Sequence, residues 1–99
     1  MDVIYHITTK TEWNEALNKG YYTASSLQTE GFIHCSKAEQ IKGVLERYFK
    51  EKNNLVKLVI NVSALEHKLQ YDFSPSVNET FPHIYGIINL NAVVTVVDL

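Results

Sequence analysis

The chain has 99 residues, of which 45% are hydrophobic and 20% are charged, and its formal net charge is -2. This length fits one domain with a single core, and the charge balance excludes an extended nucleic-acid surface, which needs an excess of basic residues. The single cysteine, Cys35, excludes an intrachain disulfide, and no segment reaches the roughly 20 apolar residues of a membrane-spanning helix. We therefore expect one cytoplasmic domain over residues 1–99, with no membrane partner.

The first half of the chain predicts two strands and two helices. Residues 2–8 are rich in β-branched and aromatic side chains, as strands are. Thr9 and Glu12 have the spacing of a capping box and Gly20 suits a helix end, so a helix is expected over residues 10–19. Residues 21–31 are polar and turn-prone, with at most a short strand at their start, and residues 31–35 predict a strand.

A second helix is expected to begin at Ser36. Ser36 and Glu39 repeat the spacing of a capping box, with Ser36 as the N-cap. Apolar residues then recur at helical spacing and form the strongest helix signal in the chain: Ile41, Val44, Leu45, Tyr48 and Phe49.

The second half of the chain predicts mainly strands. They cover residues 55–62, 68–73, 81–88 and 91–99, with a loop over residues 74–80. The last is nearly all apolar, as a central strand would be. Because parallel sheets need a helix between their strands, this order of elements favours an α+β fold with two main helices.

The stretch FIHCS, residues 32–36, places a histidine, a cysteine and a serine side by side. On a strand, Phe32 and His34 share one face while Ile33 and Cys35 share the other. Free cysteines are usually buried, so we interpret Cys35 as a core residue rather than a nucleophile. Ser36 has a role as N-cap, and the residue of interest is therefore His34.

Three of the four histidines lie in or beside predicted strands: His6, His34 and His83. Each alone is more often a core residue than a catalyst, but together they suggest one site. The spacings of structural zinc sites are missing, so no metal is expected. His67 has charged neighbours and is expected to be exposed.

A cleft lined by histidines suits a ribose, a phosphate or a nucleobase, because imidazoles donate and accept hydrogen bonds and also stack. Tyr5, Tyr71 and Tyr85 are candidate walls. Asp72 and Glu79 are candidate carboxylates that act as a base or stabilise positive charge, although solvation in a loop explains both equally well.

Several motifs, in order, resemble the domain-of-unknown-function family 952 (DUF952). They are IYHIT, SLQTEGFIHCSKAEQ and FPHIYGIINLNAVV, and the resemblance extends from Val3 to about Val97. Members of that family resemble the ADP-ribosyltransferase fold, which implies small, split and curved sheets of mixed or antiparallel strands with a cleft between them. The resemblance implies NAD as a substrate.

Carried over by position, the resemblance makes His6 the first member of the site and His34 the second. His83 is the natural third member, and Asp72 stands where the family often has glutamate, one methylene longer. The candidate ligand-binding residues around them are Thr8, Ser36, Gln40, Phe81, Tyr85 and Gly86.

Three hypotheses remain open from the sequence. The first is an NAD-utilising transferase or hydrolase that performs ADP-ribosyl or 2′-phosphoryl transfer. The second is a module that binds a small nucleotide-like ligand without turnover. The third is a structural or toxin–antitoxin type partner with a vestigial cleft. The sequence leaves the oligomeric state open.

Overall fold

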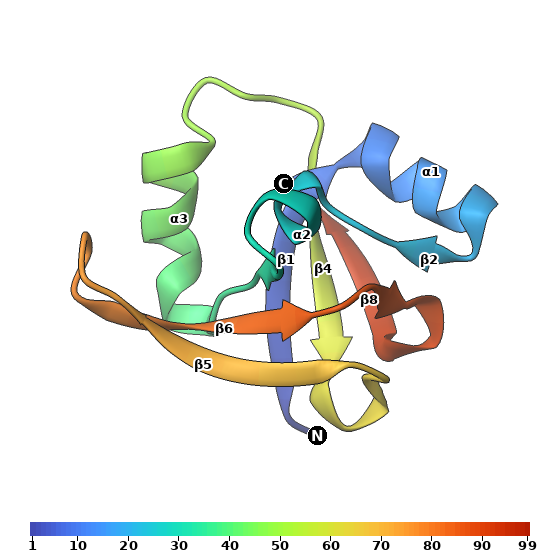
Figure 1. Ribbon diagram of the computed structural model, residues 1–99. Helices are drawn as coiled ribbons and strands as arrows, with labels where there is room; N and C mark the ends of the chain where they lie inside the picture. Colours follow the sequence, from blue (N-terminus) through green and yellow to red (C-terminus); the bar gives the residue numbers. More distant parts are fainter.

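The computed structural model describes residues 1–99 and has the expected α+β fold, with its strands divided among three small sheets (Figure 1). All strand pairs are antiparallel. The first sheet has the order β1 (Val3–Thr9), β4 (Leu55–Asn61), β8 (Val93–Asp98). The second sheet pairs β2 (Tyr21–Tyr22) with β7 (Ile88–Asn89). The third sheet has the order β3 (Ile33–His34), β6 (Glu79–Tyr85), β5 (Lys68–Ser74). The α-helices are α1 (Lys10–Lys19), α2 (Ser25–Thr29) and α3 (Ile41–Tyr48).

The strand β4 lies at the centre of the first sheet. Its predicted apolar face is buried, with Val56, Leu58 and Ile60 at most 2% exposed. The prediction that the last strand is central is wrong, because β8 pairs only with β4 and Val94 remains 47% exposed. β-branched residues favour a strand whether or not its faces are covered, so composition alone does not place a strand within a sheet.

Helix α1 has the predicted bounds. The Thr9 hydroxyl accepts a hydrogen bond from the Glu12 amide at 3.1 Å, and Gly20 ends the helix in the left-handed conformation with φ of 93°. The short helix α2 was not expected. It has five residues, no buried side chain and no side-chain cap, so it lacks the periodic pattern by which a helix is predicted.

The third sheet carries the alternation that FIHCS predicted. Ile33 and Cys35 are at most 2% exposed, whereas the His34 side chain is 53% exposed on the other face. The Cys35 amide donates to the Pro82 carbonyl at 3.0 Å, which extends the pairing of β3 with β6 beyond its two residues. The face of this sheet that bears His34 is therefore available to a ligand.

Ser36 is not the N-cap of a helix, contrary to expectation. Its backbone amide and carbonyl pair with those of Tyr5 at 2.7 and 2.9 Å, so that Ser36 belongs to the sheet region. A 3-10 turn, Ala38–Gln40, follows, and the Gln40 side chain accepts from the Lys37 amide at 2.9 Å. The first turn thus begins one residue later, at Lys37, with a glutamine at the third position.

Helix α3 stands to one side of the molecule, above the hairpin of β5 and β6 (Figure 1). None of its residues is buried, despite its clear apolar stripe. The Gln40 amide ties the start of the helix to β6 by donating to the Thr80 carbonyl at 2.9 Å. The apolar stripe of α3 is therefore only partly covered by the rest of the protein.

Candidate functional site

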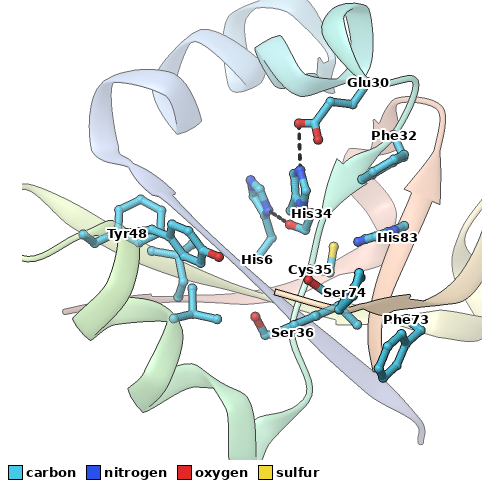
Figure 2. A pocket seen from close by; sticks show the side chains of 15 residues that line it. His6, Glu30, Phe32, His34, Cys35, Ser36, Tyr48, Phe73, Ser74 and His83 are labelled. Atoms are coloured by element: carbon cyan, nitrogen blue, oxygen red, sulfur yellow. Dashed lines mark hydrogen bonds and ion pairs between the residues drawn. The ribbon is translucent and has the colours of Figure 1, made fainter. Parts of the chain in front are cut away.

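A cavity of about 640 Å³ lies between α3, β1, β3 and the hairpin of β5 and β6 (Figure 2). We call it the histidine cavity, because His6, His34 and His83 all line it. The structure thus brings together three histidines that are far apart in sequence. Each has a different hydrogen-bonding environment, and this difference decides what each can do.

His83 is held by a carboxylate. Its Nδ1 donates to Asp72 Oδ2 at 2.8 Å, because a carboxylate oxygen can only accept. In the neutral ring the lone pair is then at Nε2, which has no protein partner. The ring stacks on Phe32 with centroids 4.0 Å apart, and Figure 2 shows both on the same side of the cavity. His83 therefore has a fixed orientation and one free basic nitrogen.

Asp72 does not line the histidine cavity but contacts His83, which does. It accepts hydrogen bonds from the Tyr85 hydroxyl, from the Gln70 amide at 2.6 Å and from His83. These donors, Tyr85 first, lower the pKa of Asp72 to about 2. The carboxylate therefore stays ionised at neutral pH and keeps a proton on Nδ1 of His83.

His34 lies directly opposite His83 in the pairing of β3 with β6. The two rings meet edge to face with centroids 5.2 Å apart. His34 Nε2 lies 2.9 Å from Glu30 Oε2, and both side chains are about half exposed. The Nδ1 atom of His34 has no protein partner, so His34 also offers one nitrogen to a ligand.

His6 is buried and has no free nitrogen. Its Nδ1 donates to the His34 carbonyl, and its Nε2 lies 2.7 Å from the Tyr22 hydroxyl. Burial lowers the pKa of His6 to about 4, so the ring is neutral at pH 7 and Nε2 accepts from Tyr22. His6 lines the cavity but serves mainly to hold the backbone of His34.

The other predicted ligand-binding residues divide into two groups. Ser36 and Phe81 line the cavity, and the Ser36 hydroxyl has no hydrogen-bond partner in the protein. Thr8 and Gln40 do not line it. The Thr8 hydroxyl lies 3.0 Å from both Tyr22 Oη and Glu12 Oε1, and the Gln40 amide is bonded to β6.

Tyr85 and Gly86 also lie outside the lining. Tyr85 donates to Asp72, and this contact raises the pKa of the phenol. A side chain at Gly86 would place Cβ 2.4 Å from Cγ of His67, so the glycine allows His67 to pack closely. His67 is exposed, as predicted.

The expected carboxylate Glu79 and the expected wall Tyr71 do not line the cavity. Glu79 lies 3.9 Å from Arg47 and 3.2 Å from the Gln40 amide, which makes it part of the attachment of α3. Cys35 borders the cavity but is 2% exposed, and burial raises the pKa of its thiol. The interpretation of Cys35 as a core residue is therefore confirmed.

The walls are formed by aromatic residues that were not predicted to belong to the site: Phe32, Tyr48, Phe49 and Phe73. For three of them the sequence pattern did hold a clue to their position. Phe32 shares a face of the predicted strand with His34, and Tyr48 and Phe49 belong to the apolar stripe of the predicted second helix, although α3 itself ends at Tyr48. Phe73 had no such signal, because its contribution depends on how the hairpin of β5 and β6 lies against α3.

The side chains form no group of three or more His, Cys, Asp or Glu residues that could hold a metal ion. None of the helices has the length and apolar character that crossing a membrane requires.

The polar side chains that offer hydrogen-bonding atoms to the cavity are His34, His83, Glu30, Ser36 and Ser74.

Comparisons with known proteins find similar solved structures and one matching family. The crystal structure of protein CC0527 from Caulobacter crescentus is similar, with 29% identity over 99% of this chain and 86% of that chain and a TM-score of 0.89. The solution NMR structure of CC0527 has 30% identity over 100% of this chain and 85% of that chain, with a TM-score of 0.84. No curated protein matches the sequence. The model of the family described as "protein of unknown function (DUF952)" matches residues 7–96, and the chain therefore belongs to this family.

Proposed function

We propose that the histidine cavity is the active site of a hydrolase or transferase that acts on NAD, with His83 as the general base. The observation that carries the proposal is the 2.8 Å contact of His83 Nδ1 with Asp72, which leaves Nε2 free at the cavity. A carboxylate that orients an imidazole in this way is a recurring arrangement for proton transfer. NAD and the ADP-ribosyltransferase-like fold come from the sequence resemblance alone.

The proposed reaction needs one proton acceptor and no acid. Nε2 of His83 takes a proton from water or from an acceptor hydroxyl, whose oxygen bonds to the ribose C1′ of NAD. The C1′–N bond breaks, and its electron pair goes to the ring nitrogen, so that nicotinamide leaves as a neutral molecule. His83 then releases the proton to solvent.

The test is release of nicotinamide from NAD by the purified chain. We expect turnover by the wild type and a loss of about 10²- to 10⁴-fold in kcat for His83→Gln, because a general base contributes by that factor. Asp72→Asn should lower kcat as well, since the amide no longer holds a proton on Nδ1. The matched control is His67→Gln, which replaces an exposed histidine outside the cavity and should leave the rate unchanged.

Circular dichroism establishes that each variant is folded before its rate is compared. Nicotinamide release by His83→Gln at the wild-type rate would refute the role of His83. Absence of release by the wild type at millimolar NAD, with or without an added hydroxyl acceptor, would refute the reaction.

A second candidate is binding of a nucleotide-like ligand without turnover. One observation favours it: the only carboxylate of the lining, Glu30, is paired with His34, so no free carboxylate stabilises the positive charge that develops on the ribose in the transition state. Under this candidate, calorimetry detects a ligand that His34→Ala loses, while no product forms under any condition.

A further inference from the structure

The aromatic stripe of α3 forms one wall of the histidine cavity. Val44 and Tyr48 reach the cavity from this helix and Phe49 from the position directly after it, yet no residue of α3 is buried. Tyr48 is 57% exposed. Ligand cavities are typically lined by such partly uncovered aromatic and apolar side chains, which gain burial when the ligand enters.

The opposite wall carries the free polar atoms. His34 and His83 each have one ring nitrogen without a hydrogen-bond partner in the protein. The Ser36 hydroxyl also lacks a partner. Phe81 lies among them in the lining. The cavity therefore has an apolar aromatic side on α3 and a side with a few hydrogen-bonding atoms on the sheet.

The charges of the lining are unsuited to phosphate. Phosphate sites use arginine, lysine or clustered backbone amides. Glu30 is the only lining residue with a formal charge at pH 7 when histidine is neutral, and it is paired with His34. Two cations lie outside the lining: the Arg47 guanidinium is 3.9 Å from Glu79 and 5.8 Å from the centroid of the Tyr48 ring, and Lys52 Nζ is 5.8 Å from the centroid of the Phe49 ring. A phosphate among the lining side chains would thus meet a carboxylate and no cation of the lining itself.

We infer that the histidine cavity encloses a flat nitrogen heterocycle that carries no negative charge, with its ring against Tyr48 and Phe49 and its polar atoms toward His34 and His83. Any phosphate of the same ligand stays outside. This inference rests on the proposed function only in taking the cavity as the ligand site. It holds whether or not the bound molecule reacts.

The test compares ligands that differ in phosphate alone. Amide chemical shifts of ¹⁵N-labelled protein are followed during titration with adenosine, AMP, nicotinamide and inorganic pyrophosphate. We expect adenosine and nicotinamide to shift signals of α3 and of His34 and His83. AMP should bind within about twofold of adenosine, since its phosphate gains no partner, and pyrophosphate should cause no shift at these sites.

Two variants and a control locate the ring. Tyr48→Ala should weaken adenosine binding about tenfold, because an aromatic face contributes on that scale to binding a base. Tyr71→Ala removes a similarly exposed tyrosine outside the cavity and should have no effect. Val44→Lys places a cation in the wall and should make AMP bind tighter than adenosine.

Three results would overturn the inference: tenfold tighter binding of AMP than of adenosine by the wild type, equal effects of Tyr48→Ala and Tyr71→Ala, or no shift with either ring ligand at millimolar concentration. Binding of adenosine without release of nicotinamide from NAD would leave the inference standing and count against the proposed reaction. Release of nicotinamide together with binding that depends on phosphate would support the proposed reaction and count against the inference.

Discussion

Single residues in the histidine cavity differ in how many of their hydrogen-bonding atoms the protein already uses. His34 and His83 each keep one ring nitrogen free, whereas both nitrogens of His6 have protein partners. A buried neutral histidine of this kind makes stability depend on pH. The native state holds His6 unprotonated down to a pKa of about 4, while the unfolded chain protonates it near 6.5.

Between about pH 6.5 and 4, the unfolded state therefore binds more protons at this position than the folded state. The free energy of unfolding should fall as the pH falls through this window, by about 3 kcal/mol in total. Urea unfolding at several pH values measures it. His6→Gln, whose amide can still donate to His34 and accept from Tyr22, should flatten the dependence, whereas His67→Gln should preserve it. An unchanged slope in His6→Gln would contradict the assignment.

Helix starts show what can be predicted at the scale of single elements. Thr9 and Ser36 have the same capping pattern in sequence, but only Thr9 caps a helix. The difference is not local: the backbone of Ser36 pairs with Tyr5, a contact that no pattern around Ser36 specifies. Helix α1 was predicted because its cap and Gly20 are both local signals.

Substitution by alanine distinguishes a capping role at Thr9 from its absence at Ser36. Thr9→Ala should reduce the free energy of unfolding by about 1 kcal/mol, the usual effect of losing an N-cap. Ser36→Ala should change it by no more than about 0.5 kcal/mol, because its hydroxyl has no partner in the protein. Chemical denaturation measures both. An equal loss at the two positions would mean that Ser36 has a capping role after all.

At the scale of the whole molecule, the sequence predicted the fold class and that the three histidines lie close together. It did not predict the order of the strands that brings them together. Alternation correctly placed His34 and Cys35 on opposite faces, since a period of two needs no tertiary information. The order of strands, by contrast, depends on which strands pair across the chain. The edge position of β8 and the contact of Asp72 with His83 both follow from such pairing.

The order of strands in the first sheet can be tested by replacing a valine with alanine on the central strand and, separately, on an edge strand. Val56 on the central strand β4 is 2% exposed, and Val94 on the edge strand β8 is 47% exposed. Val56→Ala should reduce the free energy of unfolding by about 2 kcal/mol, because two buried methyl groups and their packing are lost. Val94→Ala should cost no more than about 0.5 kcal/mol. Thermal unfolding with equal losses would contradict the central position of β4.

The shortness of β3 has a consequence for how the site is maintained. This strand has two residues, but the backbone bonds of Cys35 to Pro82 and of Ser36 to Tyr5 continue its pairing, and buried Ile33 and Cys35 anchor it in the core. His34 is therefore held opposite His83 by its sequence neighbours more than by the length of its own strand. A ligand that contacts both histidines would add a direct link between β3 and β6 to those that these neighbours provide.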